Sequence, residues 1–122
     1  MRLILTALLF VGGLFFAISG IGFLFMPQST AASFGLAAAS VQGWATIRAD
    51  MTGFFLVGGL CMLWGAWRRA GDVLLVPAAL FGIAFLGRLV SAIADGPYEG
   101  FWFPMAVEAA VVIVSIMGNR LL

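Results

Sequence analysis

Apolar residues fill four long runs of this chain, and short stretches rich in proline, glycine or charged residues separate them. The runs extend over residues 3–26, 44–67, 73–94 and 101–117. Each reaches or approaches the roughly 20 residues that a helix rising about 1.5 Å per residue needs to cross a membrane. The runs also lack the alternation of polar and apolar residues that a transmembrane barrel requires. The pattern therefore predicts four membrane-spanning helices.

Prolines mark the ends of these expected helices. Pro77 and Pro104 lie in the first turns of the third and fourth runs, where a helix tolerates a missing N–H. Pro27 closes the first run. This first run could instead be a signal peptide with Arg2 as its basic region. It is too long for a typical signal sequence and no Ala-x-Ala-like cleavage site follows it, so we expect it to remain as a helix.

Composition sets the class of protein. The chain has a mean hydropathy of +1.18 and is 64% hydrophobic and 9% charged, whereas soluble domains carry about 25% charged residues. Its 122 residues form a single domain, 1–122. Lipid solvates the outer face of such a domain, and helices satisfy its backbone polar groups. A net charge of +1 offers no footprint for nucleic acid, so we predict no nucleic-acid partner.

Arginine and tryptophan predict the orientation. With four spans, both termini and the second loop lie on the same side of the membrane. The charged residues expected on that side are Arg2, Arg68, Arg69, Asp72 and Arg120. This excess of arginine predicts that both termini are cytoplasmic. Trp44 and Trp102 would then mark the outer interface, and Trp64 and Trp67 the inner one, as an aromatic belt does.

The first loop, residues 28–40, consists of small and apolar residues. It is compatible with a short helix in the outer interface, with Phe34 and Leu36 facing inward. It is equally compatible with an ordinary apolar connector. Ser40 is a candidate cap for the second span.

Ionisable residues lie inside or at the rim of the apolar runs, and the four-span topology places them on one side. They are Arg48, Asp50, Arg88, Asp95, Glu99 and Glu108. A charge in hydrocarbon costs a few kcal/mol on insertion scales, so it is retained there only with a partner or a function. We therefore take these residues as the leading evidence for a site.

Helical geometry narrows this set to a candidate polar cluster. Counted from the outer ends of the runs, Asp50, Arg88 and Glu108 lie at similar depths of roughly 9–10 Å. Arg88 shares a stripe with Ser91 and Asp95, at spacings of three and four residues. Arg48 stands two residues before Asp50, so a regular helix would direct the two nearly oppositely. Arg48 joins the cluster only if the helix is irregular there or if its long side chain curls back. The candidate site residues are Arg48, Asp50, Arg88, Ser91, Asp95 and Glu108.

Two interpretations of this cluster remain open. In the first, Arg88 pairs with Glu108 or Asp50 and holds the helices in register, since polar pairs in membrane bundles contribute about 0.6–2 kcal/mol each. In the second, the cluster lines an outward-facing cavity that binds a polar head group or relays protons. The two interpretations are compatible with one another.

Several chemistries lack the residues they need. The chain has no histidine and one cysteine, Cys61, so zinc, haem and iron–sulfur ligands are missing. We predict neither a metal nor a cofactor. Asp50 and Glu108 could act as an acid–base pair, but nearby arginines favour their ionised forms. Autonomous catalysis is not expected. The spacings Gly13-x-x-x-Ala17 and Gly87-x-x-x-Ser91 are typical of close helix packing.

An ordered set of short motifs resembles a known family. The motifs are residues 22–27 (GFLFMP), 34–36 (FGL), 47–50 (IRAD) with 53–56 (GFFL), 86–91 (LGRLVS) with Asp95-Gly96, and Glu108 in the last run. Together they resemble the domain of unknown function 4345 family of small bacterial four-helix membrane proteins. The resemblance implies an all-α, four-helix transmembrane bundle in the bacterial inner membrane, with no established activity. Span count and size are also distantly similar to DoxX/DoxD-like proteins, some of which serve quinone-linked oxidoreductases.

Three classes of function follow from these observations. The leading hypothesis is binding of a small amphipathic molecule or membrane lipid at the outer-leaflet cluster, or a role as small subunit of a membrane complex, with a protein partner or a second copy. The alternative is a quinone-interacting subunit of an oxidoreductase, in which Arg88 and Glu108 hold the quinone head group. Proton-coupled transport would require an oligomer and inverted repeats. The sequence shows no such repeats.

Overall fold

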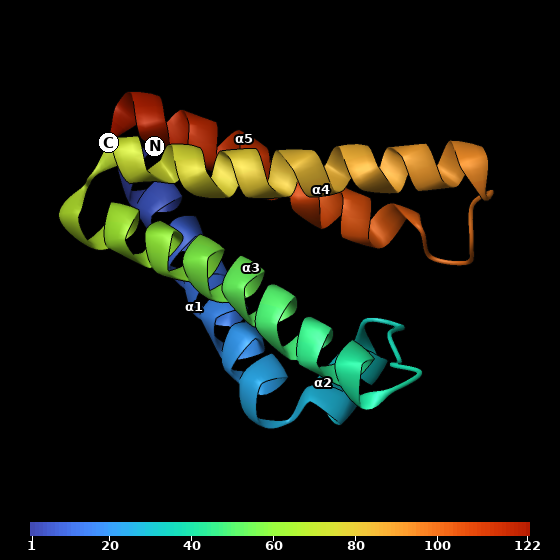
Figure 1. Cartoon of the computed structure of the whole chain (residues 1–122). Coiled ribbons are helices and arrows are strands. Elements are labelled where there is room, and N and C mark those ends of the chain that lie inside the picture. Colours follow the sequence, from blue (N-terminus) through green and yellow to red (C-terminus); the bar gives the residue numbers. More distant parts are fainter.

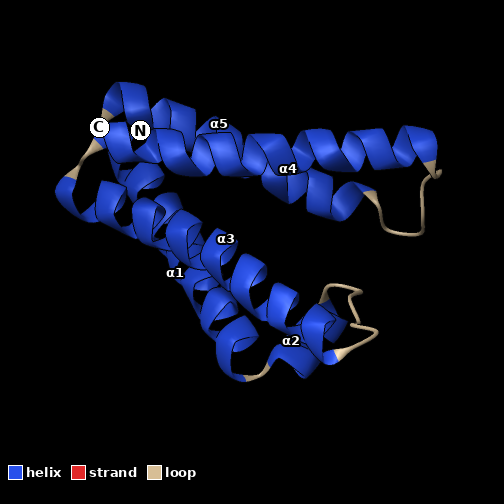
Figure 2. Ribbon diagram, in the orientation of Figure 1, coloured by secondary structure: helices blue, strands red, loops and turns tan.

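The chain is entirely helical between its loops (Figure 2). The computed structural model describes residues 1–122 and contains α1 (Arg2–Phe25), α2 (Pro27–Ser33), α3 (Val41–Arg68), the 3-10 turn η1 (Gly71–Leu74), α4 (Leu75–Ala94) and α5 (Trp102–Leu121). Four helical segments are long and apolar enough to cross a membrane: α1, α3, η1 with α4, and α5. The predicted all-α class with four candidate transmembrane helices is therefore confirmed.

Local signals explain where the helices begin and end. The Ser40 side chain accepts a hydrogen bond from the Gly43 N–H at 3.2 Å, so α3 begins at Val41, before the predicted residue 44. At its other end, Arg69 adopts the left-handed conformation (φ 52°) and the Ala70 N–H donates to the Gly65 carbonyl at 3.1 Å. The sharp stop allows η1 to turn the chain directly into α4.

The first loop contains a short helix followed by an irregular connector, and its sequence was compatible with either structure. Pro27 opens the short helix α2, in the position where its missing N–H costs nothing. The rest of the loop is irregular, with Gly35 at φ 74°. Phe34 packs against the rings of Phe23 and Phe55, at 5.2 Å between centroids in each case. These contacts fix the loop against α1 and α3.

The four long helices form two antiparallel pairs. α1 packs along α3, and α4 packs along α5 (Figure 1). Small residues allow α1 and α3 to approach closely: a Cβ atom built on Gly59 would lie 2.5 Å from the Ala17 nitrogen and 2.7 Å from the Gly13 oxygen. The Gly13–Ala17 spacing thus marks the tightest helix contact. Gly87 has nothing within 4 Å of its Cβ position, so it is not a packing glycine.

Bulky apolar residues join the two pairs at the end that carries both termini. Leu74 is fully buried, and a Cβ on Gly65 or Gly118 would collide with its side chain. Further along, the Phe81 ring lies 4.6 Å from Phe16 and 5.0 Å from Phe54, between centroids. Phe81 therefore joins α4 to both helices of the first pair.

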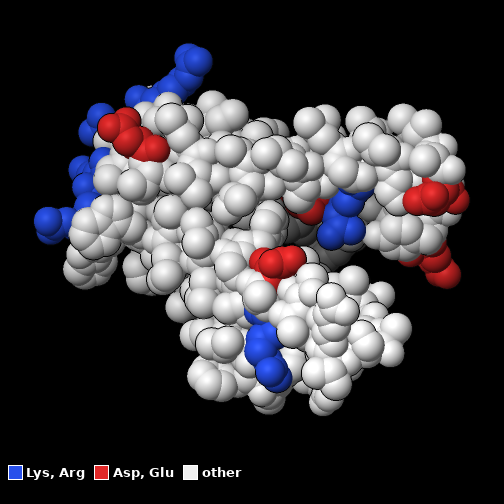
Figure 3. Space-filling view, in the orientation of Figure 1, with Lys and Arg blue, Asp and Glu red and all other residues white.

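Beyond these aromatic contacts the pairs diverge. Figure 1 shows them meeting near the termini and separating toward α2 and the α4–α5 loop, and Figure 3 shows a hollow between them that contains charged side chains. The sequence predicts a four-helix bundle, and the structure arranges its two helix pairs in a V shape, with Phe81 of α4 in contact with Phe16 and Phe54 where the pairs meet.

Candidate functional site

One ion pair lies at the cleft between the two helix pairs. The Arg88 Nε donates to Glu108 Oε2 at 2.9 Å, which links α4 to α5. The Glu108 side chain is 9% exposed and that of Arg88 is 40% exposed. Glu108 is buried because it shares the inward stripe of α5 with Val111, Ser115 and Gly118. The sequence left Glu108 and Asp50 as possible partners of Arg88, and in the structure Arg88 pairs with Glu108.

The geometry of this pair leaves hydrogen-bonding groups unused. Its single contact involves the Arg88 Nε, so the two terminal amino groups of the guanidinium make no ion pair or hydrogen bond with the protein. The second carboxylate oxygen of Glu108, Oε1, is buried without a hydrogen-bond partner. Arginine can instead bind carboxylate with two parallel bonds. The observed arrangement keeps the donor fork of Arg88 available to another molecule.

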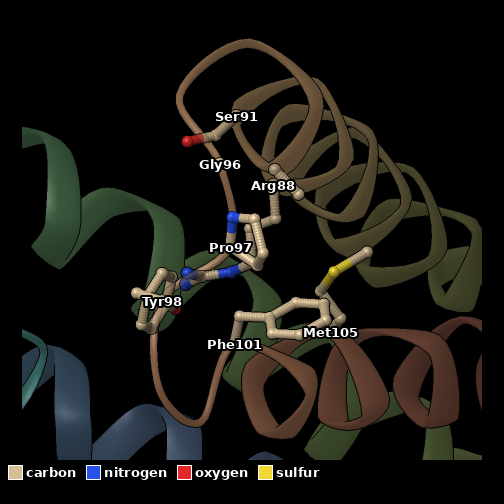
Figure 4. Close-up of a pocket in the computed structure, with 8 residues that line it drawn as sticks. Arg88, Ser91, Gly96, Pro97, Tyr98, Phe101 and Met105 are labelled. Carbon is tan, nitrogen blue, oxygen red and sulfur yellow. The ribbon is translucent and has the colours of Figure 1, made fainter.

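A small pocket adjoins the guanidinium group (Figure 4). Its lining comes from the end of α4, the following loop and the start of α5: Arg88, Ser91, Ala92, Gly96, Pro97, Tyr98, Phe101 and Met105. In Figure 4 the Arg88 side chain extends toward Tyr98. The pocket has a volume of about 50 Å³, and a cavity needs about 10–15 Å³ to hold a water molecule. It admits a few water molecules or one small polar group.

Asp50 lies on the opposite wall of the cleft. It stands one turn from Phe54 on the same face of α3, and Phe54 contacts Phe81 of α4. Arg88 stands two turns beyond Phe81 on the corresponding face of α4. Asp50 is exposed and makes no ion pair. The two hairpins thus present a carboxylate and a guanidinium to the same cleft.

The structure separates Arg48 from this group. α3 is an uninterrupted helix, so residues two apart point in nearly opposite directions, and Arg48 lies on the far side from Asp50. Arg48 is exposed and has no ion-pair partner. The irregular helix that would have brought Arg48 into the cluster is not present.

The remaining predicted residues lie at the rim. The Ser91 hydroxyl donates to the Asp95 carboxylate at 3.2 Å, which joins two members of the predicted stripe at the end of α4. Glu99 is exposed in the loop that follows. No three histidine, cysteine, aspartate or glutamate side chains lie close enough to hold a metal ion.

Sequence reasoning missed the aromatic side of the pocket. Tyr98 and Phe101 follow the Gly96-Pro97 turn, and Gly96 and Gly100 have φ angles of 93° and 79°. Both glycines permit the loop to fold back over Arg88. The one tyrosine of the chain beside a Gly-Pro pair was the available signal.

Together these features define a multi-pass membrane protein of four candidate spans, with a charged cleft between two helical hairpins. Its family is identified by sequence: residues 4–118 match the model of the domain of unknown function family DUF4345, and the chain belongs to that family. None of the curated proteins and none of the solved structures compared with the chain matches it. The DoxX/DoxD-like similarity stays a prediction.

Proposed function

We propose that this protein binds a small amphipathic molecule or membrane lipid, whose polar head lies in the cleft at Arg88. The observation that carries the proposal is the ion pair formed through Nε, which orients the guanidinium while leaving its two terminal amino groups free. A planar guanidinium binds carboxylate, phosphate or paired carbonyl oxygens through such a fork. The apolar walls of the cleft would receive the tail.

Charge balance favours a particular kind of head group. Glu108 neutralises Arg88, and Asp50 adds a carboxylate on the opposite wall. A head group that offers acceptor oxygens to Arg88 and a donor to Asp50 matches both walls. A purely anionic head would meet the two carboxylates as well as the guanidinium, which weakens its attraction.

The pocket volume limits how the head can bind. Sites that enclose drug-sized ligands measure about 300–1,000 Å³, and the pocket beside Arg88 measures about 50 Å³. A complete head group therefore lies in the open cleft, with one oxygen-bearing group or a bridging water inside the pocket. A quinone, the alternative ligand, would enter the same way, with one carbonyl directed at Arg88.

The proposal includes a topology: a bacterial inner-membrane protein with both termini in the cytoplasm and the cleft opening toward the periplasm. The arginine bias of the chain supports it. A reporter fused after Leu122 should be active in the cytoplasm, and a cysteine introduced as Gln42→Cys in a Cys61→Ala background should react with an impermeant thiol reagent from outside. Periplasmic activity of the C-terminal reporter would contradict this orientation.

Conservative substitution of the guanidinium tests the site. Arg88→Lys keeps the charge but loses the planar fork. We expect the protein extracted in mild detergent to retain its co-purified amphipathic molecule about tenfold less well, because one charge-assisted hydrogen bond is lost. Native mass spectrometry measures retention and identifies the molecule. Arg48→Lys is the matched control, since Arg48 is an exposed arginine on α3 that points away from Asp50 and makes no ion pair.

The mass of the retained molecule also separates the candidate ligands. A phospholipid or other amphiphile supports the leading proposal, and a quinone supports the alternative. Unchanged retention in Arg88→Lys, at equal thermal stability, would rule out Arg88 as a binding residue. A stoichiometric protein partner with no bound small molecule would instead assign the protein to a larger complex.

A further inference from the structure

A second feature lies at the opposite end of the molecule from the cleft. The side chains Phe10, Leu60, Leu63, Trp64 and Trp67 line an open groove of about 410 Å³ between α1 and α3. Every lining residue is apolar. Trp67 is 73% exposed and Leu60 is 55% exposed, so the groove faces the surroundings of the protein and not its core.

The groove follows from helical spacing. Leu60, Trp64 and Trp67 recur at intervals of four and three residues, so they form one stripe along the last turns of α3. Phe10 of α1 supplies the opposite wall. The stripe runs along the helix axis and ends where α3 ends, at Arg68 and Arg69.

Two arginines, Arg68 and Arg69, follow the groove residues at the end of α3. The Arg68 guanidinium lies over the Trp64 ring, with its central carbon 5.4 Å from the ring centroid. Arg69 follows directly and is exposed. Figure 3 shows basic side chains gathered at the end of the molecule that carries the termini. The charged residues of that end are Arg2, Arg68, Arg69, Asp72 and Arg120.

We infer that this groove binds an anionic phospholipid of the membrane leaflet that faces the termini. One acyl chain lies along Leu60, Trp64 and Phe10, and the phosphate lies at Arg68 and Arg69. Basic groups beside apolar helix surfaces bind anionic lipid heads in this way. The inference is independent of the proposed function, because it uses a different end of the molecule and none of the cleft residues.

Charge complementarity selects the lipid over other occupants. A second copy of the chain would bring the same excess of arginine to the groove, and like charges there would repel. A zwitterionic lipid would fill the groove, but the net positive charge of the arginines would not attract its neutral head group. An anionic head uses both the groove and the charge, so the expected preference is for negative lipids.

Tryptophan quenching tests the inference. The full-length chain carrying Trp44→Phe and Trp102→Phe retains Trp64 and Trp67 as reporters beside the groove. In vesicles of phosphatidylcholine, a small fixed fraction of brominated phosphatidylglycerol should quench their emission more than the same fraction of brominated phosphatidylcholine. The double variant Arg68→Gln/Arg69→Gln should lower the apparent affinity for phosphatidylglycerol about fivefold for each arginine removed. Arg48→Gln, at the other end, should leave it unchanged.

Three results would overturn the inference. Equal quenching by the two brominated lipids would remove the preference for an anionic head. Retention of the preference in Arg68→Gln/Arg69→Gln would place the anion elsewhere. Full competition by soluble glycerol phosphate would show a bare anion site without an acyl-chain groove. Native mass spectrometry of the same variants, each checked for unchanged helix content, gives a second readout that does not depend on the tryptophans.

Discussion

Replacing Arg88 with leucine is expected to destabilise the protein by about 1–3 kcal/mol, which is the usual cost of leaving a buried polar group without its hydrogen-bond partner. Glu108 would then keep a buried carboxylate with neither oxygen paired, since Oε1 has no partner even in the intact protein. The free energy of unfolding, measured in mixed micelles by denaturant titration, checks the prediction.

Substitution of Glu108 shows whether the stability lost in Arg88→Leu comes from the Arg88–Glu108 ion pair. Adding Glu108→Leu to Arg88→Leu removes the stranded carboxylate, so the double variant should recover part of the lost stability. A coupling energy of at least about 1 kcal/mol in this cycle is expected for groups in contact. Strictly additive losses would mean that Arg88 and Glu108 do not interact. Asp50 would then become the candidate partner of Arg88.

The second large effect is expected at the contact between α1 and α3. Gly59→Ala would place a methyl group 2.5 Å from the Ala17 nitrogen and 2.7 Å from the Gly13 oxygen. Both are backbone atoms, so no side-chain rotation relieves the clash, and the helices must separate. We expect a loss of about 3 kcal/mol, at the upper end of overpacking effects.

A matched glycine on the same helix provides the control. Gly53 has nothing within 4 Å of its Cβ position, so Gly53→Ala should leave the free energy of unfolding unchanged or raise it by up to about 1 kcal/mol through helix propensity. Thermal unfolding of the two variants side by side measures the difference. Equal effects at the two positions would contradict the close approach of α1 to α3.

The sequence predicted the helices well because hydropathy and helix ends are local properties. Ser40 could be identified as a cap from its position, and the structure contains that hydrogen bond. The Gly13–Ala17 spacing also indicated the tight contact between α1 and α3. Gly87 has the same spacing but no neighbour, because the motif does not encode which face of a helix meets a partner.

The site was harder to predict because it depends on how the helices are arranged. Depth along each run placed Asp50, Arg88 and Glu108 at one level, but the choice of Glu108 as the partner depends on the rotation of α5 about its axis. The V shape depends on where Phe81 contacts Phe16 and Phe54. The aromatic wall of the pocket comes from a loop, whose path no periodicity describes.

A crystal structure of the protein grown in a lipidic mesophase, with lipid or quinone retained from the native membrane, would show whether the cleft at Arg88 holds a ligand. We expect an elongated molecule in the cleft between the two helix pairs, with polar atoms within hydrogen-bond distance of the terminal amino groups of Arg88. The Nε contact with Glu108 should persist. A closed bundle, in which Arg88 also pairs directly with Asp50 and no space remains between the hairpins, would contradict this expectation.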